Sequence, residues 1–150
     1  MSKAMRTLKI FAAVALLLSL SVYTAEAQCK AFAKKTCLPE LGLYTHDGNY
    51  HAAVLMEGEE AELYKTFYSG MDYRLVICNE ETIPAVEFTV YDASRNVIFS
   101  NKENKNIKSW DFKLESSQQL RLVLKVGSSG QAGTQPSSGC VSIMFGFRVK

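Results

Sequence analysis

The stretch from Thr45 to His51 holds the residue types best suited to acid–base chemistry. It contains His46, Asp47 and His51 within seven positions. Two imidazoles and a carboxylate that converge on a loop make an acid–base or metal site. The spacing of the two histidines matches neither a helix face nor a known motif. This favours the alternative, a polar turn in which Asp47 and Asn49 bind backbone groups. An enzymatic function would rest on this stretch alone.

A second group of candidate ligands is an acidic run around Gly58. Calcium prefers several oxygen ligands, but the run lacks the Asp/Asn ladder of an EF-hand loop. We therefore predict a solvated hairpin and no cofactor, with calcium as the alternative. The run consists of Glu57, Glu59, Glu60 and Glu62.

The usual catalytic signatures are missing from the sequence. It contains no Gly-x-Ser-x-Gly elbow, no Walker loop, no Gly-x-Gly-x-x-Gly and no Cys-x-x-Cys. The two histidines are not at a spacing typical of zinc sites with the cysteines. We predict that the protein is not an enzyme and binds no metal.

Tyrosines precede and enter the first strands of the chain, at Tyr44, Tyr50, Tyr64 and Tyr68. Tyr64 and Tyr68 share strand parity and are predicted to lie on one face. Exposed aromatic side chains stack on sugars or anchor protein partners. We take these two as candidate binding residues, with core or cross-strand packing as the alternative.

Residues 1–27 have the pattern of a secretory signal peptide. Lys3, Arg6 and Lys9 precede an apolar run, and Ala25-Glu26-Ala27 supplies small residues at a cleavage site. The uncharged stretch of 16 residues from Ile10 to Ala25 is shorter than the roughly 20 that span a bilayer. We predict cleavage after Ala27 and a secreted or periplasmic protein with no membrane insertion.

The charge balance of the chain argues against nucleic acids and anionic membranes as partners. The chain has 17 basic and 15 acidic residues, but three of the lysines and arginines and one of the acids belong to the predicted leader. The remaining residues 28–150 are balanced in charge, so they lack the basic footprint of a nucleic-acid-binding protein. They also lack a polybasic cluster for anionic membranes.

The rest of the chain alternates between apolar and polar residues with a period of two. Turn residues recur every 8 to 12 positions, which is typical of half-buried antiparallel strands in a β-sandwich or barrel. We predict an N-terminal segment over residues 28–49 and an all-β domain over residues 50–150. The candidate strands lie at 52–57, 60–68, 73–78, 86–91, 97–100, 110–114, 120–126 and 141–147.

Four cysteines in an exported chain predict two disulfides. Spacing alone allows three pairings. Cys78 ends one strand and Cys140 begins the last, on faces of the same parity, so we favour Cys78–Cys140. The other pair is then Cys29–Cys37, which closes a short helical turn or loop that ends at Pro39.

The order of elements resembles bacterial pre-peptidase C-terminal (PPC) domains. The resemblance rests on Phe67-Tyr68-Ser69-Gly70-Met71-Asp72-Tyr73, on the unit from Val86 to Ile98, and on the later strands up to Val149. It implies an antiparallel jelly-roll-like β-sandwich of about eight strands, a type that is usually an accessory module of secreted proteins. Some relatives bind collagen or glycans, some with calcium. This chain differs by its cysteines and by the lack of an attached catalytic domain.

These observations predict a non-enzymatic, secreted β-sandwich that binds a protein or glycan at the bacterial cell envelope. The alternative is a structural or assembly subunit whose exposed edge strand pairs with another chain.

Overall fold

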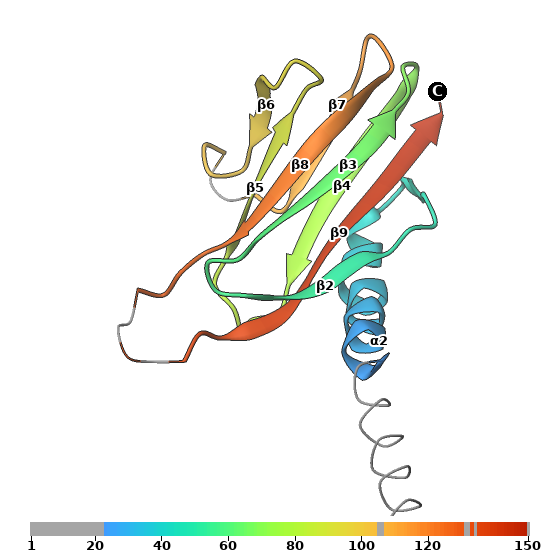
Figure 1. Cartoon of the computed structure of the whole chain (residues 1–150). Coiled ribbons are helices and arrows are strands. Elements are labelled where there is room, and N and C mark those ends of the chain that lie inside the picture. Colours follow the sequence, from blue (N-terminus) through green and yellow to red (C-terminus); the bar gives the residue numbers. More distant parts are fainter. Residues whose placement is uncertain (1–22, 105–106, 131–132, 134, 150) are drawn as a thin grey trace, which may run out of the picture.

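The protein is a β-sandwich with a helical layer on one outer face, as the computed structural model shows (Figure 1). The structure describes residues 23–104, 107–130, 133 and 135–149. Most of the predicted leader therefore lies outside the described residues. Helix α2 (Tyr23–Phe32) continues into a π-helical turn (Ala33–Cys37) and a 3₁₀ turn (Leu38–Leu41). The described strands are β1 (Thr45–His46), β2 (His51–Met56), β3 (Glu60–Phe67), β4 (Met71–Asn79), β5 (Val86–Tyr91), β6 (Val97–Ser100), β7 (Ser109–Lys113), β8 (Gln118–Val126) and β9 (Ser138–Val149).

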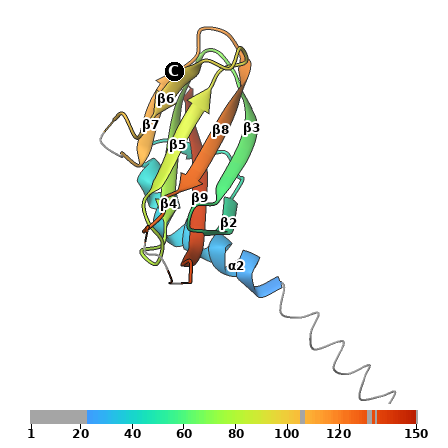
Figure 2. The ribbon, with the colours of Figure 1, turned by 60° about the vertical axis from the view of Figure 1, so that its left-hand side comes forward.

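The strands form two antiparallel sheets, as predicted. One has the order β1-β9-β4-β7, with β2 also paired to β9, and the other has the order β3-β8-β5-β6. Successive strands from β2 to β9 thus alternate between the sheets, except for the hairpin of β5 and β6, which is the order of an eight-stranded jelly roll. Figure 2 shows the two layers from the side, with β8 and β5 in front of β4 and β9. All eight predicted strands are confirmed to within a few residues.

The core lies between the sheets and consists of inward residues from both. The burial of β5 alternates along its length, with Val86, Phe88 and Val90 buried. Trp110 is only partly buried, but it stacks on Phe99 and on Phe112 at ring distances of 4.7 and 4.2 Å. Trp110 therefore packs with the core.

The N-terminal segment packs on the outer face of the β9–β4 sheet. Leu41 of the 3₁₀ turn lies there in a second apolar cluster with Val76 of β4 and Met144 of β9. Cys29 is joined to Cys140, with 5.2 Å between their Cα atoms, and Cys37 is joined to Cys78, with 5.7 Å. Both disulfides therefore fasten the helical layer to the sheet.

Both predicted disulfide pairings, Cys29–Cys37 and Cys78–Cys140, are wrong. Cys29 and Cys37 lie eight positions apart along continuous helical turns, a rise of about 12 Å in an α-helix. A disulfide requires Cα atoms less than about 7 Å apart. Cys78 and Cys140 do share a face, but Cys78 lies opposite Ser142, so Cys140 is displaced along the neighbouring strand. Each of the two sheet cysteines is instead covered by the helical layer.

Strand β1 was not predicted, because its two residues lie in a stretch whose sequence indicates a polar turn. Thr45 pairs with Phe147 and His46 pairs with Gly146. Pro39, expected to end a helix, lies in the 3₁₀ turn after the α-helix has ended at Phe32.

Gly146 allows the chain before β1 to cross closely over β9. A Cβ atom at this position would lie 2.6 Å from Cβ of Tyr44 and 3.2 Å from Cδ2 of Leu41. We expect Gly146→Ala to lower the free energy of unfolding by about 1–3 kcal/mol, as overpacking does. Urea unfolding of the variant would test this, and a free energy equal to that of the wild type would show that Tyr44 is not held against β9.

Candidate functional site

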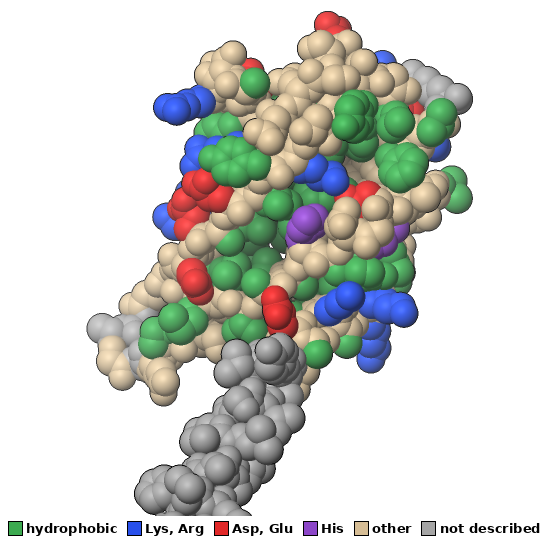
Figure 3. Space-filling view, turned by 45° about the vertical axis from the view of Figure 1, so that its right-hand side comes forward, with side chains coloured by type: hydrophobic (Ala, Val, Ile, Leu, Met, Phe, Trp, Pro, Cys, Tyr) green, Lys and Arg blue, Asp and Glu red, His purple; other side chains and the backbone are tan. Residues whose placement is uncertain are grey.

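The sandwich is hollowed along one side, where β2 of the first sheet and β3 of the second are the edge strands. Figure 3 shows this hollow as an apolar depression with histidine and lysine side chains beside it. Small side chains leave the space, since Ala53 of β2 and Ala61 of β3 both line it. We call this feature the seam and define it by the residues of its two pockets, given below.

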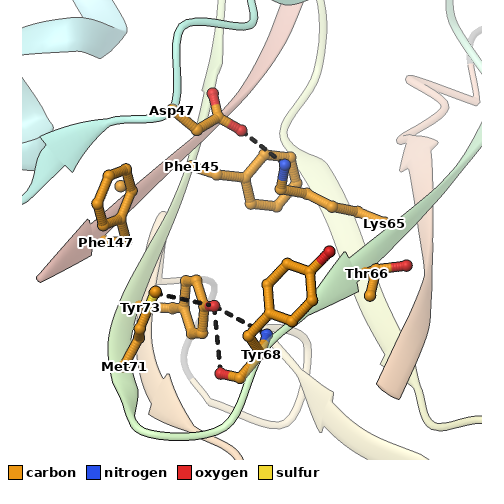
Figure 4. Close-up of a pocket in the computed structure, with 9 residues that line it drawn as sticks. Asp47, Lys65, Thr66, Tyr68, Met71, Tyr73, Phe145 and Phe147 are labelled. Carbon is orange, nitrogen blue, oxygen red and sulfur yellow. Dashed lines mark hydrogen bonds and ion pairs between the residues drawn. The ribbon is translucent and has the colours of Figure 1, made fainter. Parts of the chain in front are cut away.

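The first pocket has a volume of about 230 Å³ and an almost wholly apolar wall (Figure 4). It is lined by Asp47, Lys65, Thr66, Tyr68, Met71, Tyr73, Phe145, Gly146 and Phe147. The hydroxyl of Tyr73 lies at one end of this pocket and is held there by hydrogen bonds. This hydroxyl accepts a hydrogen bond from the backbone N–H of Tyr68 at 2.9 Å and lies 3.2 Å from the carbonyl oxygen of Tyr68.

The second pocket, of about 200 Å³, continues along the seam toward the β2–β3 hairpin. It is lined by His51, Ala52, Ala53, Leu55, Ala61, Glu62, Leu63, Leu124, Val141 and Ile143. The ring of His51 meets the ring of Phe145 edge-on at 5.7 Å, so the walls of the two pockets are in contact.

An ion pair lies across the seam and joins the two sheets. Lys65 Nζ is 2.7 Å from Asp47 Oδ2, and both side chains are largely buried. Lys65 occupies an inward position of β3, between Leu63 and Phe67. Its ammonium group lies 5.1 Å from the centre of the Phe145 ring, within range of a cation–π interaction. The pair therefore connects the edge strand β3 with the loop between β1 and β2.

Asp47 is held ionised by its neighbours. Burial opposes ionisation, but hydrogen bonds from Lys65 and from the backbone N–H of Asn49, together with the charge of Lys65, outweigh it and keep the pKa below its ordinary value. The bond from Asn49 to Asp47 Oδ1 measures 2.9 Å. This is the turn that the sequence favoured over an acid–base site.

The structure brings the predicted acid–base residues only partly together. His46 Nε2 is 3.7 Å from Asp47 Oδ1, beyond a hydrogen bond, and 3.1 Å from the carbonyl oxygen of Asn49. His51 packs against Phe145 instead of facing Asp47 with a hydrogen bond. Lys65, which sequence reasoning did not single out, is the residue that engages the carboxylate.

The half-buried position of His51 predicts a pH dependence of stability. Burial lowers the pKa of His51, while Asp47 raises it and the charges of Lys65 and His46 lower it further. The unfolded chain therefore takes up this proton first, so stability is lost as the pH falls from about 7 through the ordinary pKa of about 6.5. We expect His51→Gln to remove part of this loss in urea unfolding at pH 7.5, 6.5 and 5.5. An unchanged slope in the variant would contradict the burial of this ring.

The two candidate binding tyrosines lie in different surroundings. Tyr68 is 59% exposed and lines the first pocket. Tyr64 is 56% exposed, points outward from β3, and lines a separate pocket with Tyr91 and Arg121. Neither is a core residue, and the two do not share a pocket. Their role in binding stays a prediction.

The acidic run forms the β2–β3 hairpin, as expected. The carboxylate of Glu57 accepts hydrogen bonds from the hydroxyls of Ser129 and Ser137, at 2.8 and 2.6 Å, and these bonds lower its pKa. Glu62 is paired with Arg121 across the neighbouring strand.

Among the described residues, no three His, Cys, Asp or Glu side chains are grouped so as to hold a metal ion. None of the helices in the described ranges is long and apolar enough to cross a membrane.

The comparisons with known proteins give structural similarities only. No family model matches the sequence, and no curated protein matches it at the threshold applied. The structure is similar to Aeromonas hydrophila PliG, a periplasmic lysozyme inhibitor of g-type lysozyme, with a TM-score of 0.49 and 9% identity over 71% of this chain and 89% of that one. It is similar to the pre-peptidase C-terminal domain of a collagenase from Bacillus anthracis, with a TM-score of 0.49 and 14% identity over 65% of this chain and 87% of that one.

One of these two structures is a PPC domain, the type that the sequence resembles. At identities of 9% and 14%, these similarities concern the fold and carry no statement about ligands. The seam must therefore be interpreted from its own residues.

Proposed function

We propose that the protein is a non-catalytic β-sandwich module that binds a partner protein at the bacterial cell envelope through the seam. The observation that carries this proposal is the pair of adjoining apolar pockets, the first of which has the Lys65–Asp47 ion pair in its wall. Half-exposed Tyr68 at the rim of the first pocket is the aromatic anchor.

The size and chemistry of the pockets favour a protein over the other ligands considered. Small-molecule sites measure about 300–1,000 Å³, whereas these pockets have volumes of about 230 and 200 Å³. Each is suited to one large apolar side chain. A glycan would need several polar groups, but the side chains that line the first pocket are mostly aromatic and aliphatic. The one ion pair there is already internally satisfied.

The location outside the cytoplasm is supported by two features. Residues 1–27 have the pattern of a signal peptide. All four cysteines are paired in disulfides, which persist in oxidising compartments.

The proposed absence of catalysis follows from how the polar residues of the seam are used. The carboxylate of Asp47 is bound by Lys65 and Asn49, so it is not aligned with either histidine as a general base requires.

Photo-crosslinking in the source cells tests the proposal. A benzoylphenylalanine at Tyr68 is expected to form a discrete adduct with another protein. The matched control carries the same group at Val97, which is 54% exposed on β6 at the opposite edge of the second sheet. Adducts absent from both positions, or equally strong at both, would overturn the proposal.

The same experiment examines the alternative function, an assembly subunit, which the free edge of β3 favours. In that case the adduct at Tyr68 contains a second copy of this chain, which mass spectrometry identifies. An adduct with a different protein supports the binding module.

A further inference from the structure

We infer that the partner enters the seam as an extended strand that pairs with the free edge of β3 and places apolar side chains, four residues apart, in the two pockets. This inference rests on the proposed function, because it names the form of the protein that the seam binds. The segment that occupies the seam has large apolar residues at positions i and i+4 and a short polar residue at i+2. It also has a basic residue near the end of the seam that adjoins the β2–β3 hairpin.

The free edge of β3 has backbone groups available for such pairing. The backbone N–H of Val126 donates to the carbonyl oxygen of Glu59, and the register pairs each following residue of β3 with one of β8. Bonded and non-bonded positions alternate in an antiparallel pair. The N–H and C=O groups of the even-numbered residues therefore point away from β8, toward the open side. These residues are Glu60, Glu62, Tyr64 and Thr66, and all four are exposed.

The spacing of the pockets matches the period of a strand. On β9, Val141 and Ile143 line the second pocket, and Phe145 and Phe147 line the first. The two pockets are therefore centred four residues apart, or about 13 Å along a strand. The lining residues of β3 show the same offset. Since alternate side chains of an extended segment face the same side, residues i and i+4 reach both pockets.

The Lys65–Asp47 ion pair belongs to the wall of the first pocket, and Lys65 is the inward residue of β3 that follows Leu63 of the second pocket. Residue i+2 of the added strand, between the two apolar residues, would therefore face this ion pair. An inward charge on an edge strand discourages indiscriminate pairing with other strands. A large apolar residue at i+2 would bury the ion pair without offering it hydrogen bonds, which is costly. A serine or threonine at i+2 offers a hydroxyl to Asp47. The ion pair therefore favours partner strands that have a short polar residue at this position.

The negative charge at the hairpin end of β3 indicates which end of the partner segment is basic. Glu59 and Glu60 flank the start of β3 at the hairpin, beside the second pocket. No lysine, arginine or histidine among the described residues lies within ion-pair distance of either carboxylate. Figure 3 shows acidic side chains beside the apolar hollow. A lysine or arginine just beyond the residue in the second pocket complements them.

A designed peptide serves as the probe. Its sequence is Thr-Phe-Thr-Ser-Thr-Leu-Thr-Lys, blocked at both ends, with Phe and Leu four residues apart and Ser between them. Titrated into the isotope-labelled, disulfide-bonded protein, it should produce saturable amide shifts and slower hydrogen exchange at Glu60, Glu62, Tyr64 and Thr66. A control peptide of the same composition, with Phe and Leu three residues apart, should bind at least tenfold more weakly.

Two proline variants separate strand pairing from simple docking. Tyr64→Pro removes one outward N–H and leaves the bonds to β8, whereas Tyr64→Phe keeps the N–H, and Tyr64 lines neither pocket of the seam. We expect at least a tenfold loss of peptide affinity for the first and little change for the second. Thr66→Pro repeats the test at a second outward N–H if Tyr64→Pro does not fold, with the wild-type protein as its reference.

Failure of this inference is distinguishable from failure of the proposed function. Equal binding of the two peptides, no amide shifts, or no effect of either proline would overturn strand pairing. The crosslink from Tyr68 to a partner protein would then still stand and the seam would bind its partner in another way. Loss of that crosslink would overturn both.

Discussion

Replacing Cys29 and Cys140 together by alanine is expected to lower the free energy of unfolding by about 5 kcal/mol. The two residues are 111 positions apart, so their disulfide restricts the unfolded chain more than the other one does. The chain-entropy relation gives about 5 kcal/mol for a loop of this length. The variant also removes the covalent link between α2 and β9, and Cys29 is fully buried in that contact.

The matched control is the double replacement of Cys37 and Cys78, which are 41 positions apart. The same relation gives about 4 kcal/mol for this pair. Urea unfolding of both double variants measures the two losses. A non-reducing peptide map of the wild type should contain Cys29 linked to Cys140. A map with Cys29 linked to Cys37, or a smaller loss for the Cys29/Cys140 variant than for its control, would contradict the structure.

The strands could be predicted from the sequence because each has one face in the core. Val86, Phe88 and Val90 alternate with more polar neighbours, and the observed β5 has the predicted bounds. The two-residue strand β1 could not be predicted this way, since Thr45 and His46 are too few to show a period. Its pairing depends on Gly146 of β9, which is distant in the sequence.

The disulfide pairing was mispredicted because parity says which face a cysteine lies on but not what covers that face. Cys78 and Cys140 do face the same side of their sheet, as predicted. The residues that cover this side come from the N-terminal segment, whose sequence was interpreted as a short turn or loop. Once that segment is helical, Cys29 and Cys37 are too far apart to pair with each other, and each reaches a different strand.

The candidate site was predicted only at its rim. Tyr68 was selected and does line the first pocket, while Tyr64 was selected by the same parity but lines a separate surface pocket. The sequence did contain a signal for Lys65, namely a charged residue among the inward positions of β3 between Leu63 and Phe67. Its partner Asp47 lies in the loop between β1 and β2 of the other sheet, so their meeting depends on the tertiary fold.

Phe67→Ala is expected to lower the free energy of unfolding by about 3–5 kcal/mol, because the residue is fully buried at the junction between core and seam. Its ring meets three aromatic rings from three strands edge-on, with centres 4.9 Å from Tyr73, 5.1 Å from Phe112 and 5.6 Å from Phe145. Few neighbours can move to fill the cavity, since each of these rings is held by its own strand.

Urea unfolding compares this variant with Phe67→Leu, which keeps most of the volume and should lose much less. Val97→Ala, at an exposed position of β6, should stay within about 0.5 kcal/mol of the wild type. A loss below about 1 kcal/mol for Phe67→Ala would show that the three rings close around the space. Because Phe145 is also a wall of the first pocket, such a collapse would reshape the seam, and the peptide affinity of Phe67→Ala would then fall even though its stability did not.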